Sequence, residues 1–364
     1  MRNLFLISLI AALWSCGSSE TPDTKTAVDP NLIGRQLVGE AQGTTYHITY
    51  LGDTTDYQPQ IDSLLDRFDQ DLSTWRPGSL INQINAHNRR DTVFGFVDST
   101  RFFSAVFDLS REIYTTTDGA FDPTVLPLIK GWGFQLEQRS DMNQQKVDSL
   151  LAMVDFSEYG IDIAEFTAPD NEYLYSHTEV LKLNPNVQLD FNAIAQGYSI
   201  DLIGDLLRSY DIHNFMVELG GEVLCSGSGT TGGPWRIAID KPEEGDTHST
   251  QAVVSLSDKA LATSGNYRKF YQEDGQRYSH IVNPKTGYPA QNTLLSATVM
   301  ADDCGVADAY ATALMVMGED AIAFLQNHPA LGLEAYLIFD QGGQLQVVVT
   351  PGMAPLVEGL ELTE

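Results

Sequence analysis

The sequence predicts an α+β fold, in which helices and antiparallel strands are interspersed without a repeating strand–helix unit. Some segments carry apolar residues at helical spacing, and others alternate between apolar and polar residues. Glycine-rich turns between the alternating segments indicate that neighbouring strands are antiparallel. With 364 residues, 43% of them hydrophobic, the chain can bury a full core, and it contains no internal repeat.

The individual elements follow from these patterns in chain order. A strand is predicted at residues 43–52, and amphipathic helices at residues 60–73 and 101–117. Residues 138–183 are expected to be loop-rich, with one short helix near residues 144–154. The elements predicted after this region are a helix at 192–210, short strands with glycine-rich turns within 214–240 and 250–265, a strand at 296–301, a helix at 306–318 that ends at Gly318, and a hairpin at 335–353.

The formal net charge of −28 and the pI near 4.3 argue against a nucleic-acid partner, because binding to nucleic acid needs a basic surface. A strongly acidic surface also repels phosphate esters. If the substrate carries phosphates, a cation or a shielded cleft must offset that repulsion.

Residues 1–16 resemble a bacterial lipoprotein signal. A basic Arg2 precedes an apolar run that is too short to span a membrane, and Leu13-Trp14-Ser15 leads to Cys16, the expected lipidation site. An ordinary cleaved secretion signal and a fortuitous apolar start are the alternatives. The polar residues 17–31 are expected to form a flexible tether, followed by one domain at 32–364.

Two cysteines remain, Cys225 and Cys304. One disulfide between them is conceivable outside the cytoplasm, although we expect both to be small core residues. The string Gly227–Gly232 matches a dinucleotide-binding fingerprint, but an alternating, strand-like segment follows it. It is therefore expected to be a hairpin loop.

Four segments carry oxygen ligands and small residues that a purely structural role does not require. In the first, Asp118-Gly119 forms a turn before Ala120-Phe121-Asp122; capping aspartates at a helix end are the alternative. In the second, Asp190 or Asn192 is expected to cap the helix at 192–210. Small residues there, Ala193, Ala195 and Gly197, would let an anion approach, or would serve a close helix–helix contact.

The third segment places Asp308 and Thr312 four residues apart, on one face of a predicted helix. A carboxylate and a hydroxyl are hard oxygen ligands that suit Mg²⁺. A capped core helix is the alternative. In the fourth, Thr263-Ser264-Gly265 forms a small polar turn, and His280 alternates with apolar residues in the next strand. Proline turns fix the end of that strand, as a catalytic group requires, although such a histidine can also be a satisfied core residue.

Together and in this order, the motifs resemble the family of FAD:protein FMN transferases known as ApbE. The resemblance covers nearly all of the chain after the tether. It rests on "GTTYHITY", "LSTWRPGSLINQIN", "TDGAFDPTVLPLIKGWGF", "LDFNAIAQGYSIDLI", "VELGGEV", "ATSGNYRKFY", "RYSHIVNPKTGYP" and "DCGVADAYATALMVMG".

The resemblance implies a two-lobed α+β fold with FAD in a cleft between the lobes. It also implies a magnesium-dependent enzyme, lipid-anchored to a bacterial membrane and facing the periplasm, with the cytoplasmic membrane favoured over the outer one. Such an enzyme splits FAD, releases AMP and links FMN through a phosphoester to a Thr or Ser of an acceptor protein, such as a subunit of a membrane redox pump.

The resemblance further implies roles for individual residues. Trp75 and the turn Ala120-Phe121-Asp122 would contact the flavin, and Ala193, Ser264, Gly265 and His280 would line the cofactor site. The Ala193 carbonyl, Asp308 and Thr312 would hold Mg²⁺, and the catalytic roles fall to His280 and Asp308.

The sequence departs from the family pattern at two positions. Gln42 replaces a frequent Met, and Gln196 replaces a frequent Lys, which removes a positive charge near the diphosphate. These changes bear on FAD affinity and on the balance between transfer and hydrolysis. Two alternatives therefore stay open: a magnesium-dependent FAD pyrophosphatase that yields FMN and AMP, and a non-catalytic lipoprotein that stores FAD.

Overall fold

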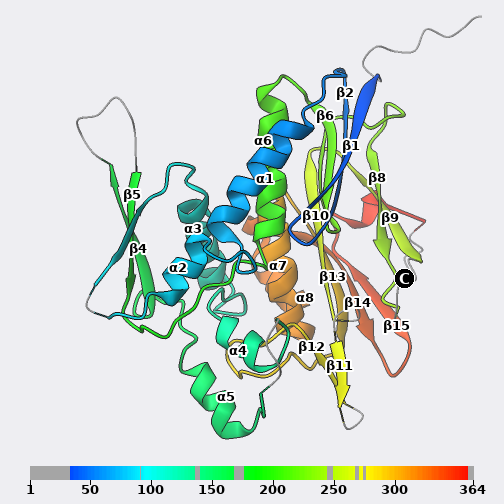
Figure 1. The fold of residues 1–364 in the computed structure, drawn as a ribbon. Coiled ribbons are helices and arrows are strands. Elements are labelled where there is room, and N and C mark those ends of the chain that lie inside the picture. Colours follow the sequence, from blue (N-terminus) through cyan, green and yellow to red (C-terminus); the bar gives the residue numbers. More distant parts are fainter. Residues whose placement is uncertain are drawn as a thin grey trace, which may run out of the picture.

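A computed structural model describes residues 33–90, 92–135, 140–167, 176–243, 249–266, 270–273 and 276–359. Helices and antiparallel strands are interspersed along the described chain, which confirms the predicted α+β class (Figure 1). The expected signal segment 1–16, with Cys16, and the tether 17–31 lie outside the described residues. Within the described part, no helix is both long and apolar enough to cross a membrane.

The largest element is an eight-stranded antiparallel sheet. Its faces are both buried, as β14 illustrates: Leu337 and Phe339 join one core cluster, whereas Tyr336 and Ile338 join another on the opposite face. In sheet order its strands are β1 (Gly34–Ala41), β2 (Thr44–Leu51), β6 (Asn214–Leu219), β7 (Glu222–Ser226), β10 (Lys259–Gly265), β13 (Leu294–Ala301), β14 (Glu334–Asp340) and β15 (Leu345–Val349).

Different elements cover the two faces of this sheet. On one face, α6 (Ala195–Ser209) and α7 (Cys304–Met317) pack against each other and against the central strands (Figure 1). On the other face lies a three-stranded sheet of β8 (Trp235–Asp240), β9 (Thr250–Leu256) and β16 (Val357–Glu358). The large sheet is thus the middle layer of three.

The remaining elements lie beside the α6–α7 layer. Helix α1 (Gln58–Leu72) packs on α6 through the stripe Ile61, Leu65, Phe68 and Leu72, the helical spacing on which its prediction rested. The other elements are α2 (Leu80–Ala86), α3 (Phe102–Thr116), α4 (Leu126–Gly131), α5 (Gln144–Leu151), α8 (Ala321–Asn327), the sheet of β3 (Phe94–Val97), β5 (Ser176–Lys182) and β4 (Ile161–Thr167), and the hairpin of β11 (Phe270–Glu273) and β12 (Gln276–Ser279).

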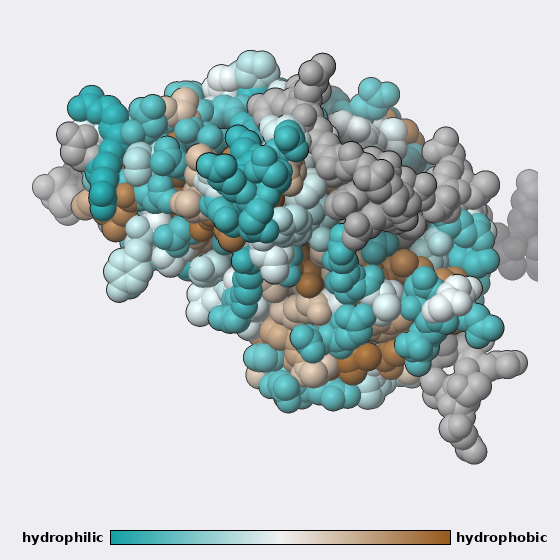
Figure 2. Space-filling model, turned by 90° about the horizontal axis from the view of Figure 1, so that it is seen from below, coloured by the Kyte–Doolittle hydropathy of each residue, from teal (hydrophilic) through white to brown (hydrophobic). Residues whose placement is uncertain are grey.

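Figure 2 views the end of the molecule at which α5 lies in Figure 1. Hydrophilic residues cover much of the described surface there, with smaller apolar areas between them. This agrees with the high net negative charge of the chain.

Several expectations about local structure were wrong. Thr263, Ser264 and Gly265, which were expected to form a turn, lie within β10. Residues 138–183 contain the two strands β4 and β5 besides the short helix. Helix α6 begins at Ala195 with Ile194 as N-cap and without a side-chain cap, so neither Asp190 nor Asn192 caps it. His280 lies just after β12, in a bend, and not within the strand.

Other expectations were confirmed. The string at residues 227–232 lies in the loop between β7 and β8, so it is no dinucleotide-binding turn. These two strands belong to different sheets, so the expectation of a hairpin loop was wrong. Cys225 and Cys304 are both buried and free, as core residues. Gly318 ends α7 with a φ of 62°, a conformation that glycine adopts without strain.

Candidate functional site

Two of the predicted metal ligands, Asp308 and Thr312, lie on α7, as the sequence indicated. The Asp308 carboxylate is buried, with 6% of the residue exposed, and its Oδ2 accepts a hydrogen bond of 3.2 Å from the Gly197 N–H. Burial raises the pKa of Asp308 to about 7. One turn further along, Thr312 Oγ1 lies 3.0 Å from Ser264 Oγ on β10. Asp308, Thr312 and Ser264 therefore belong to one region between α7 and the sheet.

Gly197, one of the small residues at the start of α6, serves helix packing. A Cβ on Gly197 would lie 2.3 Å from the Cys304 carbonyl oxygen and 2.9 Å from Asp308 Cβ. The close helix–helix contact left open by the sequence is therefore present at Gly197. Ala193 lies in the segment just before α6 and is partly buried against the same core cluster as α7.

The turn from Asp118 to Asp122 adopts a conformation that few sequences allow. Asp118 and Gly119 have φ values of 50° and 74°, in the left-handed region. Ala120 and Phe121 are buried, so they form part of the core. Asp122 is buried too, and its Oδ1 accepts hydrogen bonds from the backbone and hydroxyl of Thr124. Burial outweighs these bonds and raises the pKa of Asp122 to about 7.

The turn after His280 is held by hydrogen bonds of two side chains, those of Asn283 and Trp132. Asn283 Oδ1 accepts from the backbone N–H groups of Lys285 and Thr286, at 2.9 and 3.2 Å. The Trp132 indole N–H donates to the Gly287 carbonyl at 2.8 Å, and this bond is buried. These contacts fix the turn that follows the partly buried His280.

An ion pair connects this turn with the Asp118 turn. Lys285 Nζ lies 2.5 Å from Asp118 Oδ2, and both side chains are largely exposed. Although such a pair adds little stability, it shows that two motifs 167 residues apart in the sequence meet in space.

The loop that carries Trp75 is organised by α2. Asn82 Nδ2 donates to the carbonyls of Thr74 and Arg76, at 3.1 and 3.0 Å, on either side of Trp75. Trp75 itself is 50% exposed, so its ring is available for stacking against a ligand. One turn along the same helix, Asn85 exchanges two hydrogen bonds with the Leu189 backbone, at 2.8 and 2.7 Å.

Sequence reasoning missed Asn82 and Asn85 as positioning residues. Through their hydrogen bonds, these asparagines make α2 the link between the Trp75 loop and the segment that leads to Ala193. The only sequence signal was the pair of asparagines three residues apart, which places both amides on one helical face. A third missed residue in this region is Lys182, which is fully buried and donates to the His87 carbonyl at 3.0 Å. Burial lowers the pKa of Lys182 to about 8.

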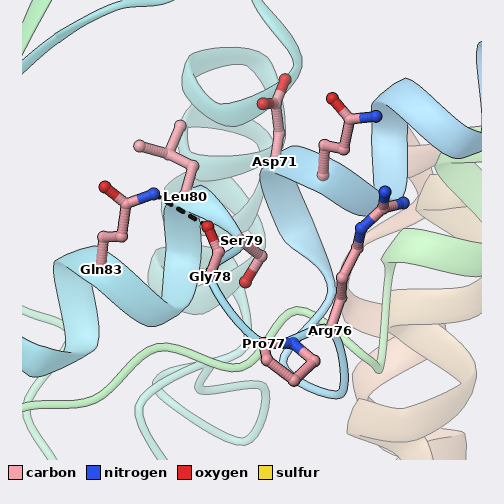
Figure 3. Close-up of a pocket in the computed structure, with 8 residues that line it drawn as sticks. Asp71, Arg76, Pro77, Gly78, Ser79, Leu80 and Gln83 are labelled. Carbon is pink, nitrogen blue, oxygen red and sulfur yellow. Dashed lines mark hydrogen bonds between the residues drawn. The ribbon is translucent and has the colours of Figure 1, made fainter.

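Two cavities lie near these elements. The first, of about 280 Å³, lies between α1 and α2 and contains none of the predicted site residues (Figure 3). Within it, Gln83 donates to the Gly78 carbonyl at 2.9 Å, whereas Arg76 is paired with Asp66. The cavity is lined by Gln70, Asp71, Arg76, Pro77, Gly78, Ser79, Leu80 and Gln83.

The second cavity, of about 500 Å³, lies at the turn between β1 and β2 and includes Gln42. Gln42 has a φ of 52°, and neither amide atom of its side chain has a hydrogen-bond partner within the described residues. Gln196 approaches this turn, because a Cβ on Gly220 would meet both the Gln196 amide nitrogen and Thr44. The two departures from the family pattern thus lie near each other.

The donor set around Asp308 fits a hard cation. Among the described residues, no group of three or more His, Cys, Asp or Glu side chains could hold a metal ion. A metal here would therefore use one carboxylate, hydroxyl and backbone oxygens, and oxygens of water or substrate. Mg²⁺ is typically bound in this way, through one or two carboxylates with waters and substrate phosphates. Among the described residues, Asp308 is buried without a cationic partner, which points to the same conclusion.

The fold and site define a mixed α/β protein with a candidate oxygen-ligand metal site and a half-exposed tryptophan. The model of the ApbE family matches residues 42–337. An FAD:protein FMN transferase of Vibrio cholerae is 37% identical over 305 residues, which cover 81% of this chain and 86% of that relative. An FAD:protein FMN transferase of Haemophilus influenzae is 32% identical, over 78% of this chain and 81% of the relative.

Solved structures show the same likeness. The flavin transferase ApbE from Vibrio cholerae matches with a TM-score of 0.74 and 31% identity, covering 89% of this chain and 99% of that one. The apo form of the Pseudomonas stutzeri flavinyl transferase ApbE matches with a TM-score of 0.74 and 28% identity. The match covers 89% of this chain and 96% of that one. The chain belongs to the ApbE family.

Proposed function

We propose that this chain is an FAD:protein FMN transferase. It transfers FMN from FAD to a Thr or Ser hydroxyl of an acceptor protein and releases AMP, with Mg²⁺ as cofactor. Family membership supports flavin transfer, because the relatives that the chain matches over most of its length carry that activity in their names. The observation that carries the magnesium requirement is the buried Asp308 carboxylate, one turn from the Thr312 hydroxyl.

The proposed metal ligands are Asp308, Thr312 and the Ala193 carbonyl. When bound, Mg²⁺ would neutralise the diphosphate and polarise the phosphorus that is attacked. Ser264 holds the Thr312 hydroxyl through the 3.0 Å contact, and the Gly197 N–H orients Asp308. The strongly acidic chain therefore needs no cluster of basic side chains to accept a phosphate ester at this site.

Flavin binding is proposed for Trp75, for Ala120-Phe121-Asp122, and for Ser264 and Gly265 on β10. The half-exposed Trp75 offers a ring face, whereas buried Ala120 and Phe121 offer backbone groups and shape. The α2 asparagines hold the Trp75 loop, and the pair of Lys285 with Asp118 links the Asp118 turn to the turn after His280.

His280 is proposed as the base or positioning group for the acceptor hydroxyl. The oxygen of that hydroxyl forms a bond to the flavin-side phosphorus while the bond to the AMP phosphate breaks, and its proton passes to the imidazole. An imidazole titrates near neutrality, which suits this role. The turn held by Trp132 and Asn283 fixes the chain directly after His280.

Lipidation of Cys16 and anchoring to a bacterial membrane, facing the periplasm, are also part of the proposal. They rest on the sequence of residues 1–16 alone. The acceptor is then a protein accessible from that side, such as a subunit of a membrane redox pump. Mass spectrometry of the membrane-bound protein tests the anchor, because a diacylglyceryl group on Cys16 would be visible directly.

The test of the activity is to mix the purified protein with FAD and Mg²⁺, with and without a flavin-acceptor domain. We expect AMP release together with the mass of FMN on the acceptor, both abolished by a chelator. AMP with only free FMN, for every acceptor tried, would identify a pyrophosphatase. Bound FAD without any AMP would identify a storage protein.

A further inference from the structure

The N-terminus of α7 is capped by a residue of another helix. Asp303 occupies the N-cap position of α7 but makes no side-chain cap hydrogen bond. Instead, Asp201 on α6 accepts two bonds there: Oδ1 from the Cys304 N–H at 2.7 Å, and Oδ2 from the Gly305 N–H at 2.8 Å. Both oxygens of one carboxylate are thus used on the first two N–H groups of α7.

One turn away, another hydrogen bond joins the two helices, with α6 as donor and α7 as acceptor. The Gly197 N–H of α6 donates to Asp308 of α7, and Gly197 and Asp201 are four residues apart on α6. Asp308 likewise follows Cys304 by four residues on α7. Each helix therefore presents a carboxylate to backbone N–H groups of the other, at two levels one turn apart.

The two helices are also in close contact at glycines. A Cβ on Gly197 would clash with the Cys304 carbonyl, and a Cβ on Gly305 would lie 3.2 Å from Tyr198. Such a contact keeps the helices together but resists sliding and rotation only weakly, because glycine has no side chain to interlock. The paired bonds of Asp201 supply the missing constraint, since they require α7 to start at one height and one rotation.

We propose that Asp201 is a positioning residue for the metal site, which fixes α7 so that Asp308 and Thr312 face the segment of Ala193. This inference rests on the proposed function, in which those residues hold Mg²⁺. Mg²⁺ demands nearly ideal octahedral geometry, so a small displacement of α7 weakens its binding. Asp201 contacts none of the proposed ligands, and its effect on the metal acts only through the position of the helix.

Asp201→Asn tests this role. The amide retains one acceptor oxygen but turns an NH₂ group toward the other backbone N–H, so one of the two bonds is lost. Changes to residues that orient metal ligands typically weaken metal affinity by about 10- to 100-fold, and we expect an effect in that range. The matched control is Asp303→Asn, which removes the same charge at the same helix end without removing a side-chain cap bond.

The measurement is Mn²⁺ binding to the full-length protein. Binding is monitored through the loss of the electron paramagnetic resonance signal of free Mn²⁺. It requires no turnover. Circular dichroism and thermal unfolding in chelator are recorded in parallel to check the fold of each variant. The Mg²⁺ concentration that gives half-maximal AMP release is then determined. We expect Asp201→Asn to weaken Mn²⁺ binding and raise that Mg²⁺ concentration, while Asp303→Asn behaves as the wild type.

The outcomes separate the two hypotheses. If Asp201→Asn and the wild type bind Mn²⁺ equally, the positioning role is wrong, whatever happens to thermal stability. If the wild type takes up no Mn²⁺ and needs no Mg²⁺, the proposed metal site itself is wrong. If Asp201→Asn fails to fold, Asp201→Glu is tested in its place. Glu keeps both acceptor oxygens but displaces them by one methylene group. Unaltered Mn²⁺ affinity in that variant would also overturn the proposal.

Discussion

The indole N–H of Trp132 donates to the Gly287 carbonyl at 2.8 Å, and neither atom is exposed to solvent. Trp132 directly follows α4, whereas Gly287 belongs to the turn after His280. This single bond therefore connects the end of a helix to the turn proposed to aim the catalytic imidazole.

Trp132→Phe should loosen that turn. The Gly287 carbonyl would remain buried without its donor, which costs about 1–3 kcal/mol of unfolding free energy. We expect a lower melting temperature and a decrease in kcat for AMP release that exceeds any change in the KM for FAD. Tyr288→Phe is the control, because it removes only an exposed bond to Gln144. Equal kcat values in Trp132→Phe and the wild type would contradict the idea that the turn positions His280.

Ser264→Ala should weaken the metal site without harming the fold. The substitution removes the hydroxyl that lies 3.0 Å from Thr312 Oγ1, so the Thr312 side chain becomes free to rotate. We expect the half-saturating Mg²⁺ concentration to rise several-fold. Ser296→Ala, in the neighbouring strand, removes a buried hydroxyl without a hydrogen-bond partner among the described residues and should leave that concentration unchanged.

Gly197→Ala should separate α6 from α7. The new methyl group would meet the Cys304 carbonyl at 2.3 Å, and backbone cannot move aside as a flexible side chain can. We expect a loss of about 1–3 kcal/mol in denaturant unfolding, as for other overpacked contacts. Gly233→Ala provides the comparison, because its Cβ would meet nothing within 4 Å. Equal stability of the two variants would contradict a tight contact between Gly197 and the Cys304 carbonyl.

Asp122→Asn should change the pH dependence of stability. The pKa of Asp122 is raised to about 7 by burial, above the value of 3.8 for an ordinary Asp. As pH rises from about 4 to 7, the unfolded chain releases this proton but the folded chain keeps it, so the free energy of unfolding falls. This contribution reaches roughly 4 kcal/mol above pH 7 and is absent in the Asn variant.

The measurement for Asp122 is urea unfolding at pH 5 and at pH 8 for both proteins. The amide oxygen of Asn can still accept the two bonds from Thr124. We expect the variant to gain stability relative to the wild type as pH rises across this range. A parallel pH dependence in both proteins would show that Asp122 titrates normally.

The sequence predicted those parts of the fold that depend on local pattern. Helix α7 was predicted because a run of helix-forming, mostly apolar residues ends at Gly318. That Asp308 and Thr312 lie on one face follows from helical spacing alone. Strands β4 and β5 were missed, because they form a small sheet with one solvated face and many polar residues. The length of each strand depends on its partner, which a local pattern does not contain.

The contacts that position the site could be predicted only in part. The proposed ligand residues follow from local motifs, but the residues that hold them in place act across long sequence separations. Asp201 caps a helix 103 residues away, and Asn85 contacts Leu189 at a separation of 104 residues. An Asp or Asn within an amphipathic helix looks like an ordinary solvated residue, so nothing in the sequence distinguishes these from their neighbours.

The place of β2 in the large sheet has a consequence for how the chain folds. Strand β2 pairs directly with β6, from Tyr46↔Leu219 to Leu51↔Asn214, although residues 52–213 lie between them. Closing so long a loop is entropically costly unless the intervening residues have already condensed. The inserted helices and the small sheet should therefore form first and bring the ends of β2 and β6 together. We therefore expect the pairing of these two strands to be a late step in folding, at a rate that depends on how fast the insertion becomes compact.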